Sequence, residues 1–305
     1  MGCTGFVGIG NMGLAMALRL REAGFAVRVR DLDPAREAQA RAAGAAVAAS
    51  PSALAADCEL LIVAVVDAAQ TEDVLFAADG AAATMRPGGT VMLCPTIAPE
   101  AVEDLARRLA GRGLACLDAP MSGGPARARD GSMSLILAGD ADVMARHRAV
   151  LEALSSRVFR VGTRPGDGAR TKLVNNLLAA VNLAGAAEAL ALAERLGLDG
   201  ARTLDVIERS SGQSWIGSDR LRRALAGDFA PRAHTTLLHK DVHLALAMAA
   251  AAGTELALGT QAAALFARAV DAGYGPLDDA SLLTLLRLPP QGPMPAPAAP
   301  PESAA

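Results

Sequence analysis

The chain has 305 residues, 52% of them hydrophobic and 3% aromatic, and its formal net charge is −3. This length and apolar content allow one large domain or two around a substantial core, and the slightly acidic balance excludes the basic surface that nucleic-acid binding requires. No apolar run reaches the roughly 18 uninterrupted residues of a membrane span, and the chain enters a strand-like segment without a secretory signal, so we expect a cytoplasmic protein with no membrane partner. The four cysteines are scattered, which predicts free thiols and no metal site.

In the first half of the chain, short β-like runs alternate with alanine-rich helical segments. Asp33 before Pro34 and Ser50 before Pro51 are typical helix starts. This alternation predicts βαβ units and a doubly wound, mainly parallel sheet. The expected strands are residues 5–7, 26–30, 60–65, 90–93 and 115–118, and the runs 133–138 and 158–161 are expected to extend the sheet.

A glycine-rich loop follows the first expected strand and opens a helix. A G-x-G-x-x-G loop at this place in a βαβ unit is typical of dinucleotide binding, although the pattern alone is weak. The first glycine permits a tight turn, the second lets the backbone approach a pyrophosphate, and the third allows close packing of helix on strand. The loop is Gly8-Ile9-Gly10-Asn11-Met12-Gly13.

The residues after the second strand indicate which dinucleotide binds. Asp31 lies about 20 residues beyond the loop, where a carboxylate accepts hydrogen bonds from the ribose of NAD and repels the 2′-phosphate of NADP. Asp33 is expected to cap the next helix. Arg28 and Arg30 keep NADP open as an alternative, because an arginine can accommodate that phosphate, but we favour NAD.

The second half of the chain has a different character. Residues 171–196 are helical in composition and apolar on nearly every face, which predicts a helix buried between domains or between subunits. The remainder reads as helices separated by glycines. We therefore predict a Rossmann domain at residues 1–165, an all-helical substrate and oligomerisation domain at 166–287, a disordered proline- and alanine-rich tail at 288–305, and a homo-oligomer, either dimer or tetramer.

Three later segments carry chemistry. In Asp118-Ala119-Pro120-Met121-Ser122-Gly123-Gly124, a hydroxyl and two exposed backbone N–H groups suit a carboxylate. Lys172 and Asn176 lie four residues apart, so they share one face of a helix. Lys172 opens a strongly apolar helix, where a lysine is unusual. The third segment is His239-Lys240-Asp241.

Together with the glycine loop, these segments resemble the β-hydroxyacid dehydrogenase family, from Phe6 to about Leu286. The resemblance implies that Lys172 is the catalytic acid–base, that Asn176 holds the substrate or the lysine, and that Lys240 reaches toward the cofactor. It also implies that the substrate carboxylate binds to Ser122, Gly123 and Gly124, and that the cofactor groove is lined by Val66, Asp67 and Thr96. Phrases such as Asp67-Ala68-Ala69-Gln70 and Ala272-Gly273-Tyr274-Gly275 resemble the L-threonate dehydrogenase type.

The implied function is NAD-dependent oxidation of a small hydroxy acid, with an L-threonate-like sugar acid favoured. A lysine that removes the hydroxyl proton must have its pKa lowered from about 10.4 by burial. 3-Hydroxyisobutyrate dehydrogenase and tartronate semialdehyde reductase remain alternatives, as does a non-catalytic dinucleotide sensor. Imine reduction is disfavoured because Lys172 is present, and zinc chemistry because His239 and His243 have no evident third ligand.

Overall fold

The N-terminal half is built on one twisted sheet with helices on both faces. The structure is a computed structural model that describes residues 2–288, and within this range the strands form a nine-stranded sheet in the order β3-β2-β1-β4-β5-β6-β8-β7, with β9 paired to β8. Pairing is parallel from β3 to β6, whereas β8 runs antiparallel to β6 and β7. The strands are β1 (Cys3–Val7), β2 (Val27–Arg30), β3 (Ala46–Val47), β4 (Cys58–Val63), β5 (Thr90–Leu93), β6 (Ala115–Asp118), β7 (Met121–Ser122), β8 (Ser134–Ala138) and β9 (Arg157–Gly162).

Two apolar layers cover the sheet. One packs α1 and α8 on one face, and the other packs α3, α4 and α5 on the opposite face. Asp33 and Ser50 cap α2 and α3 as expected, since their side chains accept hydrogen bonds from Ala35 N and Ala53 N. The helices of this half are α1 (Asn11–Glu22), α2 (Pro34–Ala42), α3 (Pro51–Ala55), α4 (Ala68–Phe76), α5 (Pro99–Ala110), α6 (Gly124–Asp130), α7 (Ala141–Arg146) and α8 (Arg148–Leu154), with a 3₁₀ turn at Ala81–Ala83.

This arrangement confirms the doubly wound, mainly parallel sheet. The strand order reverses between β1 and β4, so the loops after these two strands diverge and leave a crevice at their carboxyl ends. Two strands were not anticipated from the sequence, β3 and β7. Each has only two residues, which is too short for an alternating hydrophobic pattern to register.

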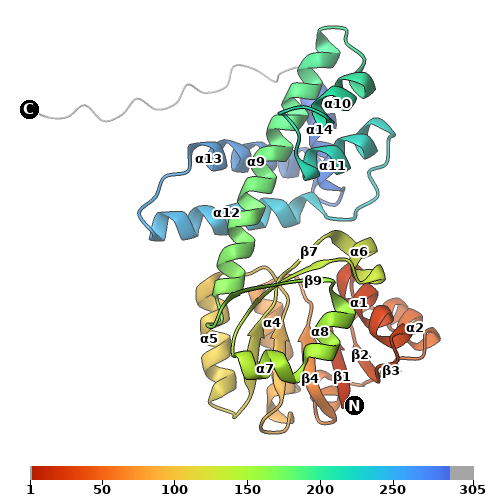
Figure 1. Ribbon diagram of the computed structural model, residues 1–305, viewed down its shortest axis with the longest axis vertical. Helices are drawn as coiled ribbons and strands as arrows, with labels where there is room; N and C mark the ends of the chain where they lie inside the picture. Colours follow the sequence, from red (N-terminus) through yellow and green to blue (C-terminus); the bar gives the residue numbers. More distant parts are fainter. Residues whose placement is uncertain (1, 289–305) are drawn as a thin grey trace, which may run out of the picture.

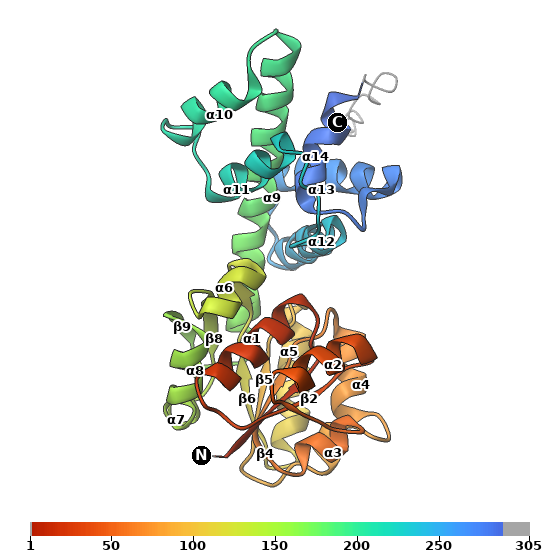
Figure 2. The same cartoon turned by 90° about the vertical axis from the view of Figure 1, so that its right-hand side faces the viewer.

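The second half is helical and is organised around α9 (Asp167–Arg195), which rises out of the Rossmann domain in Figures 1 and 2. The predicted boundary at 165/166 lies between the end of β9 and the start of this helix. Around it pack α10 (Gly200–Glu208), α11 (Trp215–Leu225), α12 (Thr235–Ala251), α13 (Ala257–Ala269) and α14 (Leu282–Arg287), with short helical turns at Val270–Tyr274 and Asp279–Ser281. Apart from Leu288, the predicted tail lies outside the described residues.

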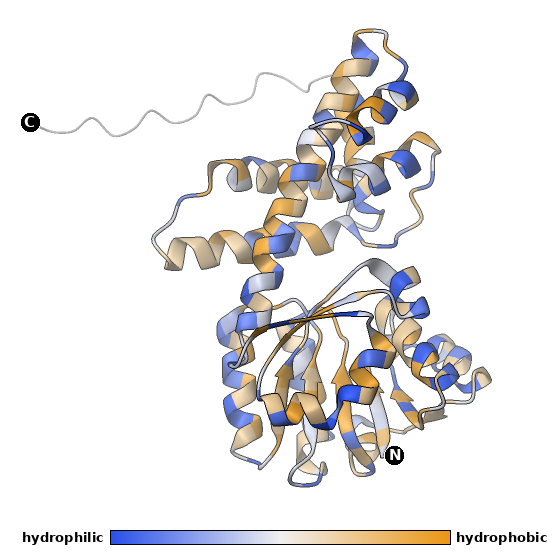
Figure 3. Cartoon of the chain, viewed as in Figure 1, coloured by the Kyte–Doolittle hydropathy of each residue, from blue (hydrophilic) through white to orange (hydrophobic). Residues whose placement is uncertain are grey.

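By length and composition alone, α9 is long and apolar enough to cross a membrane. Its inner face is nevertheless part of a protein core, where Leu183, Ala187 and Leu190 are fully buried among the other helices. Its outer face is also apolar and is uncovered in the single chain, because Val174, Leu178 and Leu192 are exposed there. The ribbon of this helix is coloured largely orange and tan in Figure 3, which marks its hydrophobic composition. The prediction of a helix apolar on nearly every face is confirmed, but the chain itself buries only part of it.

Candidate active site

A cleft of about 890 Å³ lies between the Rossmann domain and the helical domain. Both domains line it, and most of the residues singled out in the sequence meet there. From the Rossmann side come Gly10, Asn11, Met12, Val66, Thr96, Ser122, Gly123 and Gly124, and from the helical side Lys172, Asn176 and Lys240. Residues more than 200 positions apart in the chain therefore share one cavity.

The glycine loop is shaped as a dinucleotide fingerprint requires. Gly8 has a φ of +85°, and a Cβ on Gly13 would lie 2.1 Å from the carbonyl oxygen of Gly8. A Cβ on Gly10, by contrast, would meet no protein atom within 4 Å. Gly8 and Gly13 are thus required by the turn and the packing, whereas Gly10 keeps space open where a phosphate approaches the start of α1.

The acidic and basic residues after β2 are arranged in favour of NAD. Asp31 Oδ2 accepts a hydrogen bond of 2.6 Å from Ile9 N, so the carboxylate is held against the glycine loop. Arg30 is paired with Glu37 at 2.8 Å, and Arg28 is paired with Asp57. Neither arginine is therefore free to receive a 2′-phosphate without breaking its ion pair.

Five of the expected site residues do not line the cleft: Gly8, Ile9, Gly13, Asp31 and Asp67. The first four shape or support the loop beneath it. Asp67 has another role, because its Oδ1 accepts a hydrogen bond of 2.8 Å from Gln70 N and caps α4. Arg36, which was not expected in the site, lines the cleft from α2 and donates a hydrogen bond of 2.9 Å to Asn11 Oδ1.

The segment Ser122-Gly123-Gly124 forms a turn that only glycine adopts easily. Gly123 and Gly124 have φ values of +123° and +76°, and a Cβ on Gly123 would lie 2.9 Å from Arg127 Cδ. This turn brings the Ser122 hydroxyl and backbone N–H groups to the rim of the cleft opposite α9. Such a concave set of donors suits an anionic group.

Lys172 is positioned by the junction between the domains. Asp118, at the end of β6, accepts hydrogen bonds from Gly166 N at 2.8 Å and Ala169 N at 2.9 Å, which anchors the first turn of α9. Gly168 allows this close approach, since a Cβ there would lie 2.8 Å from the Asp118 carboxyl carbon. Burial raises the pKa of Asp118 to about 6. The anchored turn orients Lys172 toward the cleft.

The amine of Lys172 is unusual in its surroundings. The residue is 8% exposed, and no hydrogen bond or ion pair joins its side chain to another residue in the range 2–288. Burial lowers the pKa of Lys172 to about 8; the nearby Asp241 opposes this shift and Lys240 adds to it. A substantial fraction of this lysine is therefore neutral at mildly alkaline pH.

A short polar chain connects the two domains next to Lys172. Asn176 Nδ2 donates to Asp241 Oδ2 at 2.6 Å, and Lys240 Nζ lies 2.9 Å from Asp241 Oδ1. The same ammonium donates to the carbonyl oxygen of Thr96 in the Rossmann domain. Asn176 and Lys240 are thereby held in fixed orientations on the wall of the cleft. The sequence assigned no role to Asp241, which makes both contacts.

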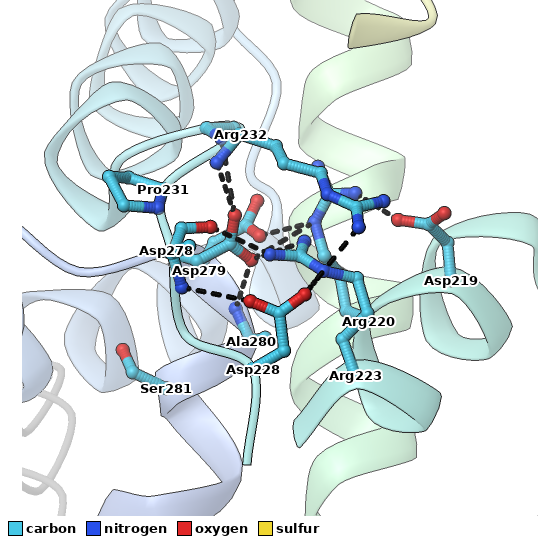
Figure 4. A network of polar contacts seen from close by, with 12 residues as sticks. Asp219, Arg220, Arg223, Asp228, Pro231, Arg232, Asp278, Asp279, Ala280 and Ser281 are labelled. Atoms are coloured by element: carbon cyan, nitrogen blue, oxygen red, sulfur yellow. Dashed lines mark hydrogen bonds and ion pairs between the residues drawn. The ribbon is translucent and has the colours of Figure 1, made fainter. Parts of the chain in front are cut away.

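The remaining wall comes from helices of the second domain. A buried ion-pair network supports it, in which Arg220 contacts Asp219, Asp278 and Asp279 (Figure 4). Burial raises the pKa of Asp279 to about 7. Arg220 lies far along the chain from Asp278 and Asp279, so no helical or strand periodicity in the sequence predicts that they meet. The polar side chains on this wall are Asn175, Asn182, Asp219, Arg220, Arg232, His234 and Asp279.

The single tryptophan also lies on the cleft. Trp215, at the start of α11, faces the guanidinium of Arg127 from α6 across the cleft, 5.1 Å from the ring centroid. The rings of His239 and His243 lie with their centroids 4.4 Å apart and their planes tilted by 56°, but residues 2–288 contain no group of three or more potential metal ligands.

Comparison with known proteins identifies the family. Residues 4–162 match the model of the NAD binding domain of 6-phosphogluconate dehydrogenase, and residues 166–286 match that of the NAD-binding domain of NADP-dependent 3-hydroxyisobutyrate dehydrogenase. L-Threonate dehydrogenase from Cupriavidus necator is 40% identical over 92% of this chain and 95% of its own length. The chain belongs to the β-hydroxyacid dehydrogenase family.

Other members of the family agree with this assignment. 3-Hydroxyisobutyrate dehydrogenase from Pseudomonas aeruginosa is 36% identical over 92% of this chain and 97% of its own. The crystal structure of 3-hydroxyisobutyrate dehydrogenase from Salmonella typhimurium, also 36% identical, superposes with a TM-score of 0.88 over 93% of this chain and all of that chain. This β-hydroxyacid dehydrogenase is an oxidoreductase that uses a nicotinamide dinucleotide to act on the CH–OH group of a small hydroxy acid.

Proposed function

We propose that this enzyme oxidises a sugar acid of the L-threonate type with NAD, using Lys172 as the acid–base catalyst. The observation that carries the proposal is the buried Lys172 amine, which has a pKa lowered to about 8 and opens on the same cleft as the glycine loop. A base with a pKa near the operating pH transfers protons efficiently.

The residues around the cleft divide into two groups in this proposal. The cofactor lies along the carboxyl edge of the sheet, and the substrate carboxylate binds Ser122 and the N–H groups of Gly123 and Gly124. Asn176, held by Asp241, orients the substrate hydroxyl or the lysine. The cofactor is bound by Gly8, Ile9, Gly10, Asn11, Met12, Gly13, Asp31, Val66, Asp67, Thr96 and Lys240, and Asp67 also caps α4.

The chemistry follows from these positions. A bound nicotinamide supplies the hydride acceptor. Neutral Lys172 takes the hydroxyl proton during oxidation, and protonated Lys172 returns it during reduction, where its charge also stabilises the developing alkoxide. Because the amine is buried, little water competes for that proton.

The preference for a sugar acid rests on the helical wall of the cleft. Its polar side chains include Asn175, Asn182, Asp219 and His234, which suit a chain of hydroxyl groups better than the methyl group of 3-hydroxyisobutyrate. The similarity to L-threonate dehydrogenase supports the same choice. The preference for NAD rests on Asp31 and on the ion pairs that occupy Arg28 and Arg30.

A substrate panel tests the proposal. The purified protein is mixed with NAD or NADP at about pH 9, where most of a lysine with a pKa near 8 is neutral, and formation of the reduced nicotinamide is followed by absorbance. The panel contains L-threonate, D-threonate, glycerate, 3-hydroxyisobutyrate and 3-hydroxypropionate. We expect the highest kcat/KM with L-threonate and NAD.

Each other outcome revises a specific part of the proposal. A higher kcat/KM with 3-hydroxyisobutyrate would overturn the sugar-acid assignment, and a preference for NADP would overturn the role of Asp31. Cofactor binding is followed separately through the fluorescence of Trp215, the only tryptophan. Tight binding of NAD without turnover of any compound would favour the sensor function.

We also propose a cytoplasmic homo-oligomer. The uncovered apolar face of α9 supports the oligomer, because a continuous exposed apolar face is more typical of a protein interface than of a solvated surface.

A further inference from the structure

Two of the four cysteines lie next to each other, far from the cleft. Cys3 and Cys58 are register partners on the parallel strands β1 and β4, and their sulfur atoms lie 3.6 Å apart. They lie where these strands begin, whereas the glycine loop and the cleft lie at the opposite, carboxyl edge of the sheet. The pair is therefore separate from the active site.

The surroundings of the two thiols differ. Cys3 is partly exposed and a cavity of about 140 Å³ opens beside it, whereas Cys58 is buried. A hydrogen bond from the Cys58 thiol lowers the pKa of Cys3 to about 7, with a further contribution from the positive charge of Arg28. The same hydrogen bond, together with burial, raises the pKa of Cys58. Because the thiolate is the reactive form, Cys3 is the nucleophile of the pair.

We propose that Cys3 and Cys58 are an oxidisable dithiol, which hydrogen peroxide converts into an intramolecular disulfide between β1 and β4. The Cys3 thiolate attacks the O–O bond, forms a sulfenic acid and releases hydroxide, which takes up a proton to become water. Cys58 then gives up its proton and its sulfur attacks the Cys3 sulfur, so that the S–S bond forms, the S–O bond breaks and the hydroxyl leaves with that proton as a second water. The sulfurs lose two electrons to the peroxide, and an external dithiol returns the pair to two thiols by exchange, becoming a disulfide itself.

The cross-link has a defined structural consequence. The chain between Cys3 and Cys58 contains the glycine loop and Asp31, that is, much of the cofactor-binding region. A bond across this segment restricts the unfolded chain and so stabilises the folded domain. Because the pair lies at the edge of the sheet opposite the cleft, we expect the oxidised enzyme to keep its turnover and to unfold at a temperature several degrees higher.

Thiol titration and peptide mapping test the proposal. The reduced protein is treated with hydrogen peroxide, unfolded without reductant and titrated. We expect two of the four thiols to be lost, one cross-linked peptide pair containing Cys3 and Cys58, and full recovery of the thiols and of the original melting temperature with dithiothreitol. The variant Cys58→Ser should instead accumulate a sulfenic acid on Cys3 that dimedone traps.

Controls separate this reaction from general oxidation. Burial raises the pKa of both Cys94 and Cys116, so Cys116→Ser should behave like the wild type. Circular dichroism and the melting temperature confirm that each variant is folded. The proposal is overturned if all four thiols survive, if Cys94 or Cys116 reacts first, or if Cys3 is oxidised further in the wild type without a cross-link.

Discussion

The chain has only two lysines, and the ability of lysine to lose its proton explains why position 172 carries lysine and not arginine. Lys172 and Lys240 are the only lysines in a sequence with 29 basic residues, and both line the cleft. All other positions with a positive side chain at neutral pH carry arginine. Arginine serves ion pairs well but does not lose its proton in proteins. A group that must exchange a proton can therefore be lysine but not arginine.

Replacing Lys172 by methionine should separate catalysis from folding. We expect kcat to fall by about 10²- to 10⁴-fold, because general acid–base catalysis contributes an effect of that size. The affinity for NADH should remain within about twofold. The melting temperature should not fall, because methionine has a side chain of similar length and the substitution removes a buried charge. Steady-state kinetics, Trp215 fluorescence titration and calorimetry measure the three quantities.

Lys172→Arg is the matched control for this substitution. It keeps a positive charge at the same place but cannot accept a proton, so turnover should be lost to a similar extent. If either variant retained more than about a tenth of the wild-type kcat, the acid–base assignment would be wrong.

The pH dependence of the wild-type enzyme follows from the same lysine. With a pKa of about 8, kcat/KM for oxidation should rise about tenfold per pH unit below that value and level off above it, while reduction shows the opposite trend. The folded pKa lies below the unfolded one, so the folded state binds fewer protons between them. The contribution of Lys172 to stability therefore rises with pH from about 8 to about 10.4.

Isotope labelling can measure this pKa directly. A protein labelled at lysine Cε should give only two lysine signals, and Lys172→Met assigns them. The signal of Lys172 should titrate near 8, and a midpoint above about 10 would contradict the lowered pKa, since that is the range of a solvated lysine.

At the scale of elements, the loops before α12 and before α14 are joined by one carboxylate. Asp278 has no exposed surface and accepts hydrogen bonds from Arg223 at 3.0 Å and from Arg232 N at 2.8 Å, with Ala233 N and Ala280 N also donating. Figure 4 shows this carboxylate at the centre of the network. Sheet pairing between the loops is limited to a single bridge between His234 and Asp278. A few backbone hydrogen bonds, such as Thr235 N to Leu277 O at 2.9 Å, join the loops as well, and the Asp278 network supplements them.

Asp278→Ala should therefore be strongly destabilising. It removes the most deeply buried of the three acceptors of the Arg223 guanidinium, which keeps Asp228 and the Ala230 carbonyl oxygen, and it leaves the backbone N–H groups of Arg232, Ala233 and Ala280 without their carboxylate acceptor. Breaking a buried ion pair in this way costs about 3–5 kcal/mol. Asp205→Ala is the control, because the ion pair of Asp205 with Arg222 is exposed on the surface and contributes at most about 1 kcal/mol. Urea unfolding followed by circular dichroism compares the two; equal losses of stability would contradict the argument.

At the scale of the whole molecule, α9 has two apolar faces and the chain covers one. The uncovered residues follow the helical repeat and include Val174, Leu178, Leu192 and Leu196, with exposures of 57%, 59%, 58% and 69%. A stripe of this length on one face is typical of a helix that packs against another helix. We expect a second copy of the chain to cover it.

Sedimentation analysis tests this expectation. The wild-type protein should sediment as a dimer or tetramer, and the double variant Leu192→Glu with Leu196→Glu should shift toward monomer, because burying carboxylates in an apolar interface is costly. Leu32→Glu, at an exposed position on the Rossmann domain, should leave the oligomer unchanged. A wild-type monomer at micromolar concentration would refute the prediction.

Local patterns in the sequence predicted most of the elements, all but the two-residue strands β3 and β7, and the glycine loop of the site. The glycine loop, the caps at Asp33 and Ser50, the alternating strands and the apolar helix after residue 166 are all determined by interactions within a few residues. The spacing of four also placed Lys172 and Asn176 on one face of a helix, although their roles were implied by the family resemblance. The family resemblance added Lys240, Thr96 and Val66, which no local pattern connects to the cleft.

Other features depend on contacts between distant parts of the chain, and only the tertiary structure decided them. The structure adds that Asp67 caps a helix, and that Asp241, known from the sequence only as the neighbour of Lys240, orients Asn176. Cys3 and Cys58 seemed scattered in the sequence, yet adjacent parallel strands bring their sulfurs within 3.6 Å. By itself, the sequence determined the elements and the chemistry they carry, because local geometry controls both. Burial, pairing and the pKa of Lys172 were decided by the packing of the whole chain.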